Sequence, residues 1–146
     1  MPELQLVEQK VYQPGLAADY DELLASLHQV DSFNHDPEDI QAVCASQTSN
    51  FYLGMLGERA VAMATFVKPF DSLGHRTAMI DDVAVRKTSW GHQIGDTVVN
   101  LLGEHALSLG ATRIDLHSAS TREAAEALYI KHGFEIVGTR LFRKVL

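Results

Sequence analysis

The fold of this chain is decided by one stretch, Ala78-Met-Ile-Asp-Asp-Val-Ala-Val-Arg-Lys-Thr-Ser-Trp-Gly-His-Gln-Ile-Gly-Asp-Thr-Val-Val-Asn-Leu-Leu102. In its first part, an apolar run with two valines predicts a strand covered on both faces, and it consists of Met79, Ile80, Val83, Ala84 and Val85. Behind Gly91 and Gly95, apolar residues recur at helical spacing, which predicts a long helix ended by Gly110. A glycine-bearing turn into a helix leaves backbone N–H groups unpaired at the positive end of the helix dipole. That arrangement is a site for phosphate.

Composition sets the class of protein. The chain has 146 residues, of which 46% are apolar and 21% are charged, and this predicts one soluble globular domain over residues 1–146. The net charge of −7 argues against nucleic acid as the main partner, because phosphate binding needs a basic face. A single cysteine, Cys44, excludes an internal disulfide and fits a reducing compartment. No secretory signal and no membrane-spanning apolar run are visible, so we expect a cytoplasmic protein.

The other elements follow from periodicity and turn residues. Asp36 is expected to cap a helix that starts at Pro37, and the spacing of Ser120 and Glu123 predicts a capping box at the start of a last helix. Helices are therefore expected over 16–30, from 37 onward, behind Gly91, and over 121–132. Strands are expected over 4–11, 51–56, 60–67, 79–85, 112–117, 134–137 and 141–145, the last two as a hairpin.

The resulting element order is β-α-α-β-β-β-α-β-α-β-β. It predicts the α/β class, in the α+β sense of a mixed and largely antiparallel sheet that carries helices. Only the strand 79–85, the long helix and the strand 112–117 form a βαβ unit. Those two strands should be parallel neighbours.

Two local patterns point to a known family. In the first, a strand ending in valine leads to Gly91-His92-Gln93-Ile94-Gly95 at a helix start, and in the second, Tyr129 precedes a helix-ending Gly133-Phe134. Together with the element order, these patterns resemble the GCN5-related N-acetyltransferase superfamily (GNAT), which moves acetyl from acetyl-CoA to an amine. The element order covers nearly the whole chain, and the motifs cover residues 79–134. Trp90 stands where the family usually has Arg or Gln, and Gln93 where a glycine is usual, so we expect a functional but variant phosphate site.

The resemblance implies acetyl-CoA as the cosubstrate. In the family, the strand backbone pairs with the pantetheine arm and the amides of the following turn hold the pyrophosphate. Carried onto this sequence, the cofactor-binding residues are Val83, Ala84, Val85, Trp90, Gly91, His92, Gln93, Ile94, Gly95, Asp96 and Arg122.

The resemblance also implies catalytic residues. Asp81 is expected to take the proton of the amine, and Tyr129 to protonate the departing thiolate, since a phenol keeps its proton at neutral pH. Asp82 should point to the opposite face of the strand from Asp81, because side chains alternate. It is assigned to substrate binding, and its alternative role, which is favoured, is that of a structural carboxylate hydrogen-bonded to a neighbouring loop. His35 and His75 lie in loops that border the substrate in this fold. The seven histidines have no metal-ligand spacing, so no metal is expected.

We therefore expect an N-acetyltransferase that acts on a primary amine of a small molecule or peptide by direct attack. The acidic chain favours a cationic amine. The alternative is a non-catalytic acyl-CoA-binding or regulatory module on the same fold. A mononucleotide binder is disfavoured, because no Lys-Ser/Thr motif follows the glycines. The expected partner is the amine, without nucleic acid or membrane, and a homodimer stays open as an alternative to the single chain.

Overall fold

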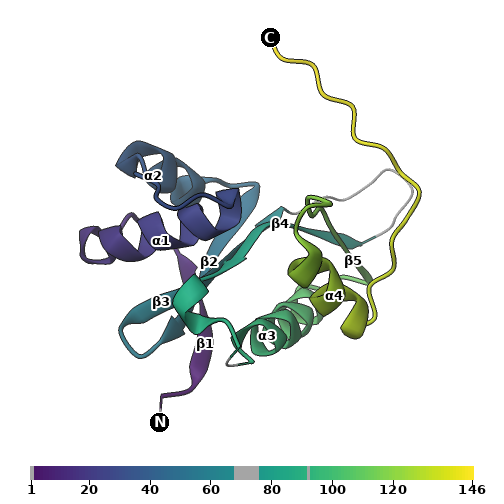
Figure 1. The fold of residues 1–146 in the computed structure, drawn as a ribbon, viewed down its shortest axis with the longest axis horizontal. Coiled ribbons are helices and arrows are strands. Elements are labelled where there is room, and N and C mark those ends of the chain that lie inside the picture. Colours follow the sequence, from purple (N-terminus) through teal and green to yellow (C-terminus); the bar gives the residue numbers. More distant parts are fainter. Residues whose placement is uncertain (1, 68–75, 92) are drawn as a thin grey trace.

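The computed structural model describes residues 2–67, 76–91 and 93–146. In this part of the chain, five strands form one sheet in the order β1-β2-β3-β4-β5 (Figure 1). All neighbours are antiparallel except β4 and β5, which are parallel as the βαβ unit predicts. The strand bounds are Leu4–Gln9 for β1, Ser49–Leu56 for β2, Arg59–Val67 for β3, Thr77–Val85 for β4 and Arg113–Leu116 for β5.

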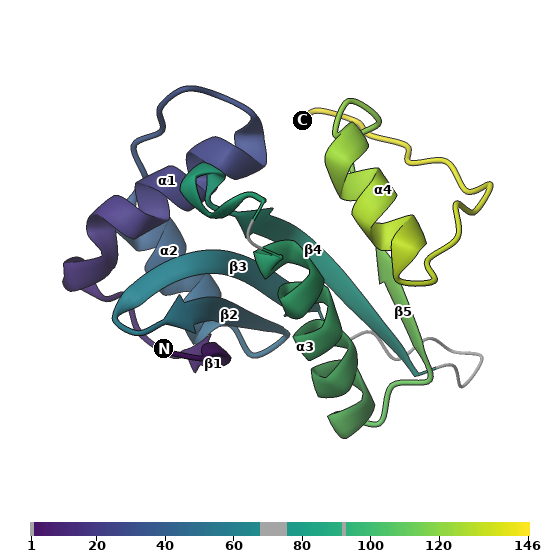
Figure 2. The same cartoon turned by 60° about the horizontal axis from the view of Figure 1, so that its bottom comes forward.

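Helices cover both faces of this sheet. Helices α1 (Ala17–His28) and α2 (Pro37–Ala45) lie on one face, while α3 (Ile94–Ser108) packs on the other with α4 (Glu123–Lys131) beside it (Figures 1 and 2). Short 3₁₀ turns at Pro14–Leu16 and Lys87–Ser89 precede α1 and follow β4. Within the described ranges, no helix combines the length and the apolar character needed to cross a bilayer.

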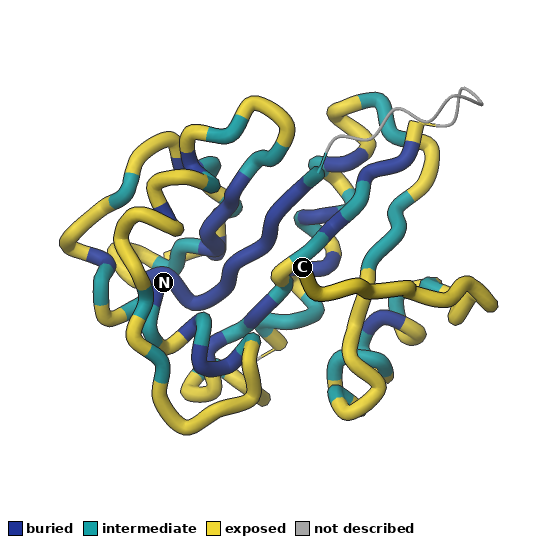
Figure 3. Tube along the Cα trace, turned by 90° about the horizontal axis from the view of Figure 1, so that it is seen from above, coloured by how far each residue is buried: buried dark blue, intermediate teal, exposed yellow. Residues whose placement is uncertain are grey.

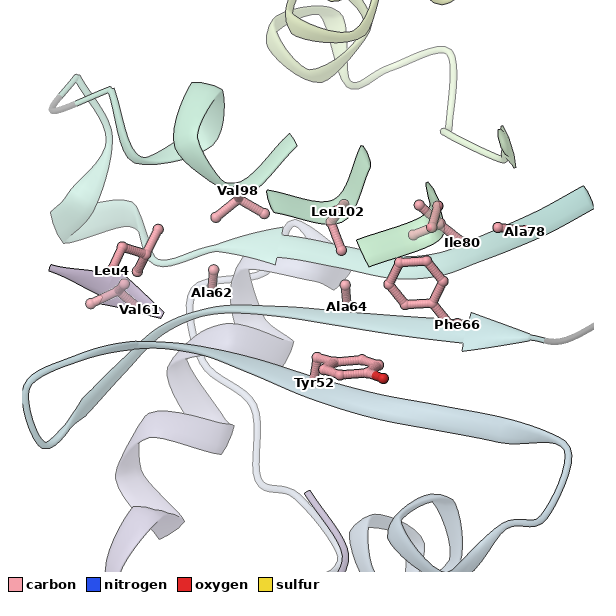
Figure 4. Close-up of a cluster of buried hydrophobic side chains, with 11 residues drawn as sticks. Leu4, Tyr52, Val61, Ala62, Ala64, Phe66, Ala78, Ile80, Val98 and Leu102 are labelled. Carbon is pink, nitrogen blue, oxygen red and sulfur yellow. The ribbon is translucent and has the colours of Figure 1, made fainter. Parts of the chain in front are cut away.

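Two apolar clusters fill the space between the layers. The α3-side cluster joins α3 to the sheet through residues such as Leu102, Ala64 and Phe66 (Figure 4). The α1–α2-side cluster packs residues such as Leu23 and Ile40 on the opposite face. Figure 3 shows that burial is concentrated in the central strands, whereas the outer loops and the C-terminal end are exposed. Each strand of the centre is thus covered on both faces, as the apolar run 79–85 predicts.

A local signal accounts for the start of α2 but not for that of α4. The carboxylate of Asp36 accepts a hydrogen bond of 2.9 Å from the Glu38 N–H and caps α2, as expected. The expected capping box at Ser120 is wrong, because α4 begins at Glu123 with Arg122 in the N-cap position and no side-chain cap hydrogen bond. The backbone around Arg122 instead bonds as a turn, its N–H donating to the Ala119 carbonyl at 2.9 Å.

The expected C-terminal hairpin is also wrong. Residues 135–146 contain neither helix nor strand and are exposed (Figure 3), and their far end extends away from the rest of the protein (Figure 1). Their apolar residues come in adjacent pairs rather than in alternation, so neither half presents one apolar face that a sheet could bury. The exposed large apolar side chains of this segment are Ile136, Val137, Leu141, Phe142, Val145 and Leu146.

Candidate active site

Strand β5 pairs along its whole length, but only with the first half of β4. The parallel register runs from Thr77 opposite Arg113 to Ile80 opposite Leu116, and it ends there. Beyond Ile80, β4 continues to Val85 while the two strands diverge (Figure 2). The second half of β4 is therefore an open sheet edge, and an extended ligand can pair with such an edge as an added strand.

A β-bulge interrupts β4 at the point of divergence. Ile80 belongs to the α3-side cluster, but Ala84 belongs to the α1–α2-side cluster. In a regular strand, residues four apart share a face, so the chain between them carries one extra residue. Asp82 has a left-handed φ of 56°, and the register between β3 and β4 shifts at this level.

The bulge brings both carboxylates to one face. Asp81 follows Ile80 and so points away from α3, and Asp82 shares the face of Ala84 two residues later. The expectation that Asp81 and Asp82 point to opposite faces is therefore wrong, since it assumed an uninterrupted strand. Both carboxylates lie on the α1–α2 side, directly beside the open edge.

The two carboxylates differ in their surroundings. Asp82 Oδ2 accepts a hydrogen bond of 3.4 Å from Thr65 Oγ1. Asp82 is exposed as a residue, but desolvation of its carboxyl beside the sheet, followed by the neighbouring charge of Asp81, raises the pKa of that carboxyl above its ordinary value. Asp81 Oδ1 lies 3.8 Å from Nδ1 of His117, which follows the β5 partner of Ile80. Sequence reasoning missed His117, although the parallel pairing of the two strands would have placed it beside Asp81.

The turn between β4 and α3 has the backbone of an anion site. Gly91 has a φ of 82° with open space where a Cβ would stand, and Gln93 has a φ of 59°. The left-handed backbone at Gln93 explains why a glycine is the usual family residue there. Helix α3 begins at Ile94, so the N–H groups of its first turn have no intrahelical partner. His92 and His75 lie outside the described residues.

Helix α4 packs closely on the start of α3. A Cβ at Gly95 would come within 3.0 Å of Leu128 Cδ2, so the glycine permits this approach. One Asp96 oxygen, Oδ1, lies 2.8 Å from both Lys131 Nζ and His132 Nε2, and these hydrogen bonds lower the pKa of Asp96. Asp96 therefore ties α3 to the end of α4, and its cofactor contact stays a prediction.

Tyr129 is the buried tyrosine of α4. It is buried, its ring packs 5.7 Å from that of Phe134, and it borders a cavity of about 320 Å³. Burial raises the pKa of the Tyr129 hydroxyl, against a smaller lowering by Arg122, so the phenol keeps its proton at neutral pH. Residues of α3, α4, β4 and β5 line this cavity, among them Ile80, Leu102, Ile114, Leu116 and Phe134.

The His35 side chain is enclosed by hydrogen-bond partners of the protein itself. Its Nδ1 lies 2.6 Å from Asp21 Oδ1, its Nε2 lies 2.8 Å from the Tyr12 hydroxyl, and its side chain is 7% exposed. Both ring nitrogens are thus used inside the protein, where they fasten the loop between α1 and α2. Among the described residues, no group of three or more His, Cys, Asp or Glu side chains is placed to hold a metal ion.

Comparisons with known proteins agree with this geometry. The model of the acetyltransferase (GNAT) family matches residues 18–134, and the chain therefore belongs to this family. No curated protein sequence matches it significantly. Among solved structures, an aminoglycoside acetyltransferase from an uncultured soil metagenomic sample, in complex with trehalose, has a TM-score of 0.79 at 14% identity, covering 98% of this chain and 97% of the other.

Two further solved structures share the fold. A ribosomal-protein-alanine N-acetyltransferase from Brucella melitensis biovar Abortus 2308 has a TM-score of 0.78 at 14% identity, with 98% of this chain and 100% of that one covered. A transcriptional regulator from Bacillus halodurans C-125 has a TM-score of 0.78 at 20% identity, with the same coverage. Members of the GNAT family use acyl-CoA donors, and the chain is an acyltransferase by family. The residues present fit such a donor, since an anion site adjoins an open strand edge.

Proposed function

We propose that this protein transfers acetyl from acetyl-CoA to a primary amine of a cationic small molecule. One observation carries the proposal: the open edge of β4 lies between an anion-binding turn on one side and a pair of carboxylates on the other. Acetyl-CoA would supply the acetyl group as a reactive thioester. The carboxylate pair suits an ammonium ion, in line with the net charge of −7.

The backbone supplies the contacts to the donor. We assign the strand groups around Val83 and Val85 to pairing with an extended arm, and the amides of Gly91 and of residues 93–95 to holding a pyrophosphate at the helix N-terminus. These contacts depend on backbone conformation more than on side chains. The departures from the family pattern at Trp90 and Gln93 are therefore compatible with donor binding.

The carboxylates and Tyr129 handle the protons. An alkylammonium must lose a proton before its nitrogen can attack, and a base is most effective when its pKa approaches the working pH. Because the pKa of Asp82 is raised, we assign the proton transfer to Asp82 and the attraction of the ammonium to its partner Asp81. Tyr129 then gives its hydroxyl proton to the departing sulfur.

The two carboxylates can be separated by their pH profiles. Asp82→Asn should lower kcat about a hundredfold near neutral pH and recover towards alkaline pH, where free amine forms without a base. In the wild type, kcat should fall as the pH drops through the raised pKa of Asp82, since protonation removes the base. Asp81→Asn should mainly raise KM for the amine. It should also move the fall of kcat at acid pH to lower pH, because the Asp81 charge that raises the pKa of Asp82 is gone. The reverse result would restore Asp81 as the base.

Donor binding itself is tested by calorimetry with acetyl-CoA and CoA. Saturation at one hundred times Kd should stabilise the fold by ~2.7 kcal/mol. Gly91→Val should weaken binding strongly, because a β-branched residue is strained at a φ of 82°. Gly103→Val is the matched control, since the same residue is placed there on the helix body, without a positive φ and with no atom within 4 Å of its Cβ. Absence of binding at millimolar CoA would overturn the proposal.

A second candidate is an acyl-CoA-binding regulatory module. It is favoured by the fold shared with a transcriptional regulator, at 20% identity. A panel of primary amines, diamines and aminoglycosides with acetyl-CoA, read by the release of free thiol, separates the two. Turnover with any amine supports the enzyme, whereas binding without turnover on the whole panel supports the module.

A further inference from the structure

The open edge of β4 is already occupied by side chains of the protein itself. The Val85 carbonyl accepts hydrogen bonds from Trp90 Nε1 at 2.9 Å and from Ser26 Oγ at 2.7 Å. The Val83 carbonyl accepts one from Arg122 Nη1 at 3.3 Å. Residues two apart on a strand direct their backbone groups to the same edge, so both carbonyls belong to the edge that β5 leaves unpaired.

These contacts conflict with a ligand that pairs with the strand. A carbonyl oxygen accepts two hydrogen bonds, so Val85 has no acceptor left while both donors are in place. Ser26 is 4% exposed on α1 and is fixed in the core, whereas Trp90 is 56% exposed at the end of a short turn. Trp90 is therefore the donor that can leave.

We propose that Trp90 holds the strand-pairing position of the pantetheine arm at Val85 when no donor is bound and is displaced by the arm. This inference rests on the proposed function. Trp90 directly precedes Gly91, so its departure from Val85 is linked through the backbone to the anion-binding turn. Arg122 uses only one of the two acceptor positions of the Val83 carbonyl and can stay in place when the arm pairs there. Trp90 is a positioning residue, because it keeps the edge paired until the donor arrives.

The emission of Trp90 tests this exchange, because the chain contains a single tryptophan. Titration with CoA should change the emission, with the same Kd that calorimetry gives. The adenosine bisphosphate part of CoA, which lacks the pantetheine arm, should bind more weakly and change the emission much less at saturation. If CoA binds by calorimetry without any emission change, or if the adenosine bisphosphate changes it equally, the exchange is wrong. If CoA does not bind at all, the proposed function fails instead.

Affinity provides a second readout. Trp90→Phe keeps an aromatic ring but cannot donate to Val85, so the arm no longer has to displace a hydrogen bond. CoA should then bind roughly two- to tenfold more tightly, the range of one net hydrogen bond. Affinity for the adenosine bisphosphate should stay the same, which controls for damage to the turn. Weaker binding of CoA by Trp90→Phe would show that the indole contacts the bound donor rather than yielding to it.

Discussion

Replacing Arg86 with methionine is expected to lower the free energy of unfolding by about 3–5 kcal/mol, the range for breaking one side of a buried ion pair. The Arg86 side chain is 2% exposed directly after β4. Its Nη1 donates to Asp19 Oδ1 at 2.6 Å, and its Nη2 donates to Glu22. Methionine would fill much of the volume but leave the largely buried Asp19 carboxylate without its cation. Urea unfolding measures the change.

The matched control is an exposed ion pair of the same kind. Lys10 pairs with Glu8 at 2.7 Å, and its side chain is 71% exposed, so Lys10→Met should change stability by less than about 1 kcal/mol. If Arg86→Met cost no more than this control, the Arg86 pair would not be holding α1 to the sheet. Arg86 also donates its N–H to the Val61 carbonyl at 2.8 Å, which sets the start of the anion-binding turn.

The part of the fold that sequence predicts well is local. Each signal that predicted these elements lies within a few neighbouring residues: the run 79–85, the glycine turn and the helical spacing behind it. The structure confirms β4 and α3, and it confirms β5 as the parallel neighbour of β4. The cap at Asp36 is equally local. In each case the residues that carry the signal belong to the element that they specify or lie next to it in the sequence.

The features that sequence reasoning missed depend on distant partners. Arginine is usually a surface residue, so the sequence around Arg86 does not predict its burial. The burial is favourable only because Arg86 pairs with Asp19 and Glu22, more than sixty positions earlier in the sequence. The bulge at Asp82 has no local signature, because one extra residue in β4 is defined only against β3. The segment 135–146 has strand-forming residues, yet a strand also needs a partner edge and one apolar face. The motifs supplied the candidate site residues, whose roles stay predictions, and they could not show that Asp81 and Asp82 share one face.

The last prediction concerns Tyr129, because it separates catalysis from donor binding. Tyr129→Phe removes the hydroxyl and keeps the buried ring with its contact to Phe134, so the fold and the affinity for acetyl-CoA should stay nearly the same. The lost proton should lower kcat by ~10²–10⁴-fold, the range for general acid catalysis. A small thiol has a pKa near ~8.5, so its thiolate can leave without help to some extent, which favours the lower end of the range.

The pH profile and a matched variant complete the test of Tyr129. Since the pKa of Tyr129 is raised from 10.0, the wild type should show no alkaline loss of kcat from this group below that pH, and the loss above it should vanish in Tyr129→Phe.

Tyr20→Phe is the control: Tyr20 is buried on α1, and its hydroxyl accepts from the Gln13 N–H at 3.3 Å. It should lose about 1 kcal/mol of stability and no kcat. Equal losses of affinity and rate in Tyr129→Phe would mean that the hydroxyl organises the site. An unchanged rate with a proven amine substrate would assign the proton to water.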